Sequence, residues 1–197
     1  MKLAHSAASP YVRKVNACAI ARGIDGKIER WKVGTTDPAL LEFNPLSKVP
    51  TLITDDGVML YDSPVICEYL DSIGSAPKLF PAAGPARWKA ICQQALGDGI
   101  LDALILCRYE TTRPEDRRWA GWTDGQMKKA HQGLATAERE DLSGPRTIGH
   151  VTLGCTLGYL DFRFPNDGWR QRHPGLAAWY REAEQLPSMQ ATKPPAS

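Results

Sequence analysis

The stretch VPTLITDDGVMLYDSPVICEYL, residues 49–70, combines two short apolar runs with an amphipathic pattern. The runs at 51–54 and 58–61 are joined by Asp-Asp-Gly, which is typical of a hairpin turn because glycine adopts positive φ without strain. Apolar residues then recur at helical spacing over 65–73, and Gly74 is placed to end the helix. The stretch therefore predicts two antiparallel strands followed by a helix.

The residues before this stretch indicate a βαβ unit. Residues 1–6 are a candidate for a short strand, and apolar residues recur on one helical face from Val12 to Ile20. The segment KIERWKV, residues 27–33, has the β-branched and aromatic content of a second strand. Together with the hairpin and its helix, these segments predict an α/β arrangement of the form βαβ-ββα.

The rest of the chain has a different pattern. The segment GSAPKLFPAAGPA, residues 74–86, holds three prolines and two glycines, which is the composition of a linker. Beyond it, apolar residues recur at helical spacing along three segments, 96–107, 127–137 and 153–164. We therefore predict an α/β domain over 1–74, a linker over 75–84 and an all-helical bundle over 85–197.

The charge content limits the classes of partner. Lys and Arg number 24 against 22 Asp and Glu, which gives a formal net charge of +2. This balance gives no reason to expect nucleic acid or an anionic membrane as a partner.

Cysteine usage and the N-terminal sequence indicate the compartment. The five cysteines are widely spaced and include no C-x-x-C pair, so we expect reduced core residues: Cys18, Cys67, Cys92, Cys107 and Cys155. The N-terminal MKLAHSAASP lacks the apolar region of a signal peptide. The longest apolar runs, such as ALILC at 103–107, are far shorter than a membrane span. These features predict a soluble cytoplasmic protein.

The order of these elements, together with five motifs, resembles the cytosolic glutathione S-transferase family over nearly the whole chain. The motifs resemble the family's first helix, its cis-proline loop, its glutathione-carboxylate motif, its buried core helix and its late helix: SPYVRKV (9–15), FNPLSKVPTL (43–52), LYDSPVICEYL (60–70), LGYLDFRF (157–164) and HPGLAAWY (173–180). The resemblance implies a thioredoxin-like N-terminal domain, an all-helical C-terminal domain, glutathione as co-substrate, no metal, and a homodimer.

Ser9 is the candidate catalytic residue. From the residues alone it is a helix N-cap, because it directly precedes Pro10 at a helix start. The resemblance implies a second role, in which Ser9 donates a hydrogen bond to the glutathione thiolate while the helix N-terminus favours the negative charge. Ser6 and then Tyr11 are the alternative hydroxyl donors. Because position 9 is not cysteine, we expect conjugation to a small hydrophobic electrophile rather than thiol–disulfide exchange.

Two further motifs supply candidate glutathione-binding residues. The resemblance implies a cis bond before Pro50, which turns the backbone of Val49 toward the cysteinyl part of glutathione, and Lys48 is then placed to pair with a ligand carboxylate. Asp62 and Ser63 begin a predicted helix, whose free N–H groups suit a carboxylate, while Asp62 suits an ammonium group. The γ-glutamyl end of glutathione carries both charges. Capping by Asp62 or Ser63 is the structural alternative.

Residues of the predicted bundle supply the remaining expectations. The resemblance implies that Asp98, one turn before Asp102, reaches the ligand amine in a partner subunit; a solvated helix face is the alternative. By analogy of fold, the electrophile is expected between the domains, bordered by residues 5–8 and by Arg108 and Tyr109.

One departure from the family pattern concerns the buried helix. The family often places aspartate three residues after Ser or Thr there, as a capping box, whereas this chain has His150 after Thr147. We interpret His150 as a structural residue with a weaker reciprocal cap. The other histidines form no metal-ligand spacing: His5, His131 and His173.

The sequence thus predicts a glutathione S-transferase. Two alternatives remain. One is a glutathione-binding or interaction protein without useful turnover, and the other is a glutathione-dependent lyase or isomerase.

Overall fold

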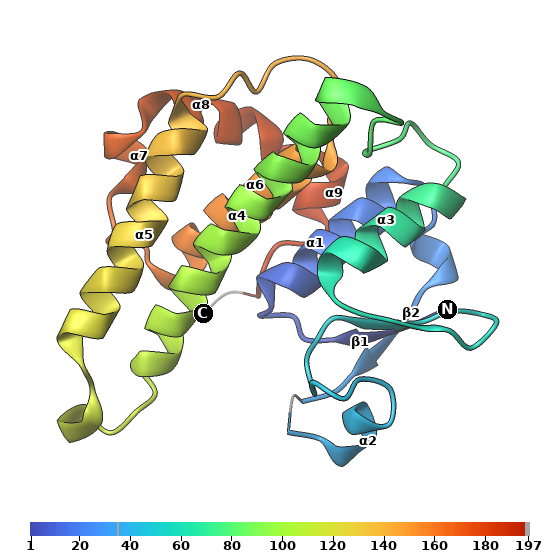
Figure 1. Ribbon diagram of the computed structural model, residues 1–197, viewed down its shortest axis with the longest axis horizontal. Helices are drawn as coiled ribbons and strands as arrows, with labels where there is room; N and C mark the ends of the chain where they lie inside the picture. The colour runs from blue at the N-terminus through green and yellow to red at the C-terminus, as the bar shows by residue number, and fades with distance from the viewer. Residues whose placement is uncertain (35, 196–197) are drawn as a thin grey trace.

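The computed structural model describes residues 1–34 and 36–195 and places a small sheet beside a stack of helices (Figure 1). The sheet order is β2-β1-β3-β4, and its strands are β1 (Lys2–His5), β2 (Glu29–Lys32), β3 (Thr51–Ile53) and β4 (Met59–Leu60). β1 pairs with β2 in parallel and with β3 antiparallel, and β3 pairs antiparallel with β4. The predicted βαβ-ββα arrangement is confirmed.

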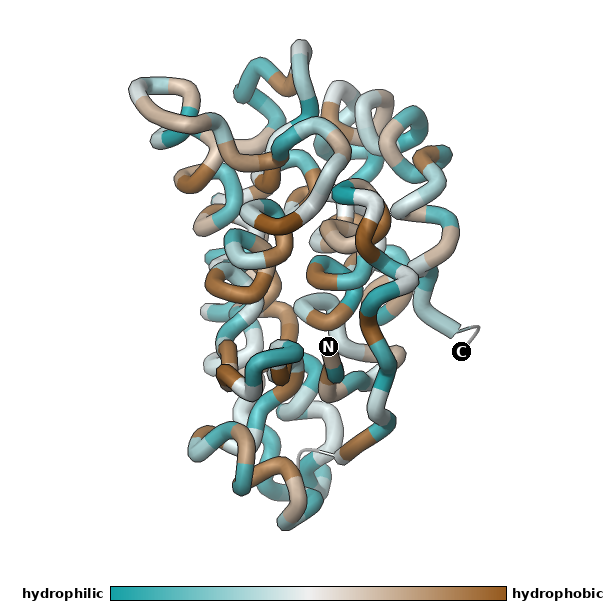
Figure 2. Tube along the Cα trace, turned by 90° about the vertical axis from the view of Figure 1, so that its right-hand side faces the viewer, coloured by the Kyte–Doolittle hydropathy of each residue, from teal (hydrophilic) through white to brown (hydrophobic). Residues whose placement is uncertain are grey.

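Helices supply the rest of the described structure. They are α1 (Pro10–Ala21), α2 (Pro38–Leu41), α3 (Ser63–Ile73), α4 (Gly84–Glu110), α5 (Ala120–Glu138), α6 (Ile148–Arg163), α7 (Trp169–Arg172), α8 (Pro174–Ala183) and α9 (Pro187–Gln190), with 3₁₀ turns η1 (Asp25–Lys27) and η2 (Glu115–Arg117). In Figure 2 hydrophobic positions recur at intervals along these helices, separated by hydrophilic ones. The predicted fold class, an α/β sheet region followed by an all-helical region, is confirmed.

The start of α1 follows from local chemistry. Pro10 occupies the first helical turn, and the Ser9 hydroxyl accepts a hydrogen bond from the backbone N–H of Val12 at 3.3 Å. The helix packs against α3, α6 and α9, so even its charged residues Arg13 and Lys14 are buried. The N-cap interpretation of Ser9 is therefore confirmed.

The core of the sheet region continues into the helical region. Leu3 and Leu52 of the sheet belong to the same buried cluster as Ile148 of α6 and Met189 of α9. Segment 75–84 is tied into this core, because the backbone N–H of Leu79 donates to Asp71 at 2.7 Å and its carbonyl accepts from Ile148 at 2.9 Å. This segment is thus ordered by specific bonds. The exact limits of the two domains stay a prediction.

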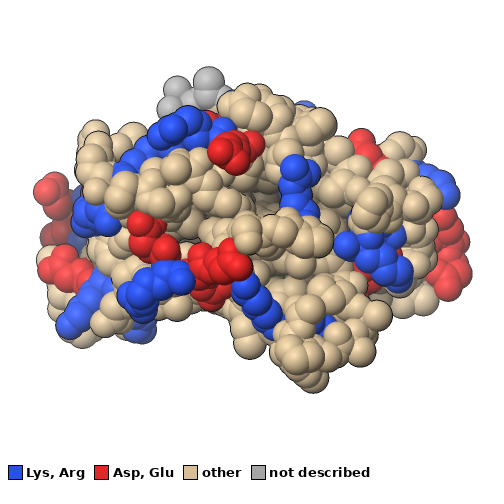
Figure 3. Space-filling model, turned by 90° about the horizontal axis from the view of Figure 1, so that it is seen from above, with Lys and Arg blue, Asp and Glu red and all other residues tan. Residues whose placement is uncertain are grey.

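Helix α4 is the centre of the helical region and packs mainly against α5 and α6. By length and composition alone it could cross a membrane, but half of its most apolar window is buried inside the protein. Core helices of water-soluble proteins have the same property. On the face shown in Figure 3, basic and acidic side chains form small interspersed groups, in keeping with the near-zero net charge.

Gly149 lets α6 approach α4 closely, and its replacement by alanine is expected to destabilise the fold. A Cβ at this position would lie 2.5 Å from Gln93 Cβ and 3.0 Å from the carbonyl oxygen of Ala90. Overpacking against a backbone atom outweighs the gain in helix propensity, so we expect Gly149→Ala to lower the free energy of unfolding by about 2 kcal/mol. Urea unfolding measures this.

Gly125 of α5 is the matched control, because a Cβ there meets no atom within 4 Å. Gly125→Ala is expected to raise the free energy of unfolding by up to about 1 kcal/mol. Equal effects of the two substitutions would contradict the close-approach argument.

Candidate functional site

A pocket of about 460 Å³ lies between the start of α3 and the middle of α4; we refer to it as the α3–α4 pocket. It contains all five residues that the sequence singled out near the sheet: Lys48, Val49, Pro50, Asp62 and Ser63. From α4 it is lined by residues about one turn apart: Ile91, Gln94, Ala95, Asp98, Gly99 and Asp102. The structure therefore brings two distant sequence motifs to one cavity.

The loop before β3 is held by a buried asparagine. Asn44, which is 1% exposed, donates from Nδ2 to the carbonyl of Lys48 at 3.1 Å and to Thr51 Oγ1 at 3.0 Å. The Thr51 hydroxyl also donates to the Lys48 carbonyl at 2.9 Å. The peptide bond between Val49 and Pro50 is cis, as the resemblance implied. These bonds fix the backbone of Val49 at the pocket.

The first turn of α3 opens into the same pocket. Its N-cap residue is Asp62, whose side chain makes no capping hydrogen bond, and Ser63 is 2% exposed. Of the two structural alternatives for this motif, capping by Asp62 is therefore absent. An N-terminus with unpaired N–H groups attracts a carboxylate.

Ser9 lies in a separate narrow cleft of the described residues, which has no room for a water molecule. This cleft is lined by Ser9, Arg13, Cys155, Tyr159 and Pro194, and the α3–α4 pocket is not lined by Ser9. Burial raises the pKa of the Cys155 thiol to about 11, so this cysteine stays protonated near neutral pH. It is no candidate nucleophile.

Of the three candidate hydroxyls, Tyr11 is the one that lines the α3–α4 pocket. Its hydroxyl donates to the carboxylate of Asp102, and burial together with this bond raises the pKa of Tyr11. The phenol therefore stays protonated with its proton directed at Asp102. Ser6 lines another cavity, of about 350 Å³, with His5 and Arg30.

The comparisons with known proteins agree with this geometry. Residues 8–73 match the family model for the glutathione S-transferase N-terminal domain, and residues 120–182 match that for the C-terminal domain. The chain is 30% identical over 200 residues to the uncharacterized GST-like protein YibF of Escherichia coli K12, with 99% of each chain covered. The chain belongs to the glutathione S-transferase family.

Solved structures of family members are similar over the whole length. A glutathione transferase family member from Pseudomonas fluorescens Pf-5 with bound glutathione is 44% identical, with a TM-score of 0.94 and 99% of each chain covered. A glutathione S-transferase from Methylobacillus flagellatus KT, also with glutathione bound, is 33% identical, with a TM-score of 0.91 and 98% of each chain covered.

Within this glutathione S-transferase fold, Asp98 has a partner in its own chain. Both carboxylate oxygens of Asp98 accept from Lys14 Nζ, at 2.6 and 2.7 Å, and the Lys14 side chain is fully buried. Burial raises the pKa of Asp98, and the Lys14 ammonium partly opposes this rise. The predicted contact of Asp98 with a partner's ligand stays a prediction. Sequence reasoning missed Lys14, because a lysine beside the apolar face of a helix is ordinarily a solvated surface residue.

The border predicted for the electrophile is not part of the α3–α4 pocket. Arg108 and Tyr109 do not line it, and Tyr109 is 63% exposed. Among residues 1–34 and 36–195, no group of three or more His, Cys, Asp or Glu side chains is arranged to hold a metal ion.

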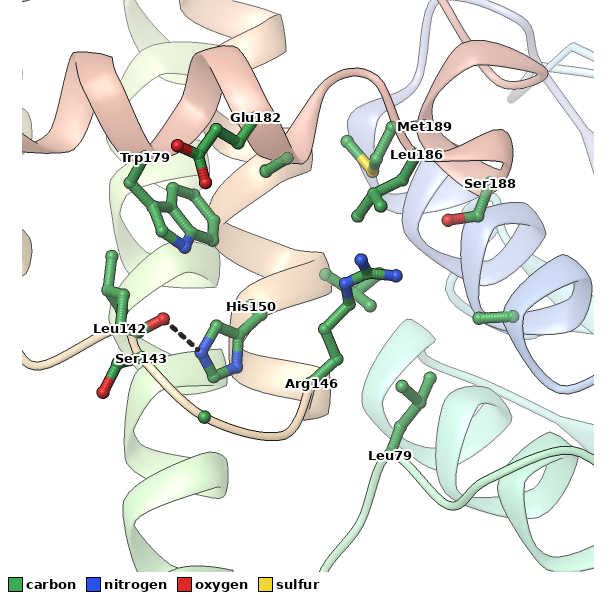
Figure 4. A pocket seen from close by; sticks show the side chains of 15 residues that line it. Leu79, Leu142, Ser143, Arg146, His150, Trp179, Glu182, Leu186, Ser188 and Met189 are labelled. Carbon is green, nitrogen blue, oxygen red and sulfur yellow. Dashed lines mark hydrogen bonds between the residues drawn. The ribbon is translucent and has the colours of Figure 1, made fainter.

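A further cavity, of about 300 Å³, lies between α6 and α8 and contains none of the predicted binding residues (Figure 4). His150 points into it beside Trp179, with ring centroids 6.1 Å apart. Its Nε2 bonds the Leu142 carbonyl at 3.3 Å, and its Nδ1 accepts from the Thr147 backbone N–H at 3.1 Å. His150 therefore completes the capping box of α6, and its expected structural role is supported.

Proposed function

We propose that this protein is a glutathione transferase that binds glutathione in the α3–α4 pocket and activates its thiol for attack on a hydrophobic electrophile. The observation that carries the proposal is the meeting of the Val49 loop and the uncapped start of α3 in one cavity. The glutathione bound in the Pseudomonas and Methylobacillus structures supports glutathione as the ligand of this pocket.

Each part of the tripeptide has a candidate partner. The N–H groups at the start of α3, with Ser63, suit the γ-glutamyl carboxylate, and Asp62 suits its ammonium group. The backbone of Val49 pairs with the cysteinyl residue as an added strand would, and Lys48 is placed for the glycyl carboxylate. We place the sulfur of such a ligand at the start of α1, because Tyr11 of the first turn of α1 lines the same pocket.

The thiolate is stabilised by the start of α1 in this proposal. The free thiol of glutathione has a pKa about a unit or more above neutral, so the site must favour the anion. The Ser9 oxygen already accepts from Val12, and its hydroxyl proton remains available to donate to the sulfur. The helix N-terminus adds positive potential at the same place.

The wider role follows from the same reaction. We propose a cytoplasmic homodimer that conjugates small electrophiles, which is a detoxifying activity. Large exposed apolar side chains on α3, on α4 and in the loop before β3 support association of two copies, because a dimer would cover them: Val65 at 47%, Trp88 at 66% and Leu46 at 61%.

A second candidate is glutathione binding without useful turnover. Two observations favour it: Ser9 lines a different cleft, and the Tyr11 hydroxyl is engaged by Asp102.

Titration of bound glutathione by ultraviolet absorbance of the thiolate separates the two candidates. For the transferase we expect calorimetric binding of glutathione, a thiol pKa lowered by about 1–2 units and turnover with at least one electrophile. Binding with an unchanged thiol pKa would assign the protein to the second candidate. Absence of binding would contradict both.

A further inference from the structure

Three polar side chains of α4 line the α3–α4 pocket, at intervals of one turn: Gln94, Asp98 and Asp102. Asp98 is held by Lys14, and Asp102 accepts from Tyr11. Gln94 differs from both. It is 4% exposed, and its side-chain nitrogen Nε2 has no hydrogen-bond partner among the described residues.

The neighbouring residue shows that this position is unusual. Gln93 is buried to a similar extent, at 2% exposed, but its Nε2 donates to Glu140 at 2.5 Å. A buried amide without a partner costs free energy that an apolar side chain of the same size would not. Gln94 is therefore a poor choice for packing alone, and its position on the pocket indicates a ligand as the missing partner.

The location of Gln94 indicates which end of the ligand its side chain would contact. Asp62 at the start of α3 and Asp98 of α4 line the same pocket, and Gln94 lies one turn before Asp98. The terminal torsion of a glutamine side chain is broad, so its amide turns toward a ligand at low cost. The ligand carboxylate can accept about four hydrogen bonds, and the N–H groups at the start of α3 do not fill all of these acceptor sites.

We propose that Gln94 recognises the γ-glutamyl end of glutathione, donating its amide N–H to a carboxylate oxygen there. The inference rests on the proposed function, because it needs glutathione in the α3–α4 pocket. It adds to that function a residue of α4 that selects ligands with a γ-glutamyl carboxylate.

Calorimetric titration of the full-length protein with glutathione and with γ-glutamylcysteine tests this. Gln94→Leu removes the donor and is expected to raise the Kd of both ligands by about tenfold, since both carry the γ-glutamyl end and a hydrogen bond to a charged group is lost. Its urea midpoint is expected to equal or exceed that of the wild type. Gln94→Glu places a carboxylate against the ligand carboxylate, so its Kd is expected to rise further.

Gln93→Leu is the matched control. It leaves Glu140 unpaired, so its urea midpoint is expected to fall, while its Kd for glutathione stays within about twofold of the wild type. The two neighbouring glutamines are thus expected to show opposite patterns, one in binding and the other in stability.

Three results would overturn the inference while wild-type binding stands. The first is a Kd of Gln94→Leu for glutathione within twofold of the wild-type Kd. The second is tighter glutathione binding by Gln94→Glu than by the wild type. The third is a Gln94→Leu protein that loses a dimer while its Kd is unchanged, because the amide would then contact a second copy of the chain. If the wild type does not bind glutathione, the proposed function itself fails.

Discussion

Lys14→Met is expected to lower the free energy of unfolding by about 3–5 kcal/mol near neutral pH, because it leaves a largely buried carboxylate without its opposite charge. The Lys14 side chain is 0% exposed and that of Asp98 is 18% exposed. The two are 84 residues apart in the chain, so their ion pair joins α1 to α4. Urea unfolding at constant salt measures the loss.

The loss is expected to depend on pH. Burial raises the pKa of Asp98 even with Lys14 present, and removing the ammonium raises it further. A carboxyl group whose pKa is higher in the folded state destabilises the fold when it ionises. The stability of Lys14→Met, relative to wild type, is therefore greatest at and below about pH 4, the unfolded pKa, and falls as the pH rises through the folded pKa.

Lys14→Met combined with Asp98→Asn is the control for this prediction. Removing both charges is expected to restore most of the lost stability near neutral pH and to abolish the additional pH dependence, because no unpaired carboxylate remains. A loss of stability that is the same at both ends of the pH range, or one that the double variant does not reduce, would contradict the argument.

The parts of the fold that could be predicted from the sequence depend on neighbouring residues. The turn at Asp-Asp-Gly and the break at Gly74 act over a few residues, so both strands of the hairpin and α3 were placed correctly. The cis bond before Pro50 was anticipated only through the family resemblance, because an isolated Val-Pro bond is usually trans.

The parts that could not be predicted depend on contacts between distant residues. Lys14 has the sequence signature of a surface lysine, and its burial results from the packing of α1 against α3, α6 and α9. Gln94 has the signature of a solvated helix residue. Whether Ser9 or Tyr11 lines the pocket depends on where the side chains of the first helical turn point, a detail that periodicity does not contain.

Ser9→Ala is expected to raise the pKa of the bound glutathione thiol by about 1–2 units, because a hydrogen bond to a charged group contributes about 1.5–3 kcal/mol and one pKa unit corresponds to about 1.4 kcal/mol. The conjugation rate near neutral pH is expected to fall by about 10–100-fold and to recover as the pH is raised, since the thiolate then forms without the hydroxyl. Thiolate absorbance and pH–rate profiles at saturating glutathione measure both effects.

Two variants show which hydroxyl is responsible. Ser6→Ala makes the same change of residue in a different cavity, and Tyr11→Phe removes a hydroxyl that Asp102 already engages, so neither is expected to move the thiol pKa.

Because Ser9 also caps α1, Ser9→Ala is expected to lose about 1 kcal/mol of stability, which thermal unfolding detects separately from the pKa. An unchanged thiol pKa in Ser9→Ala with a raised one in Tyr11→Phe would transfer the role to Tyr11. An unchanged value in both would leave the backbone N–H groups of α1 as the source of thiolate stabilisation.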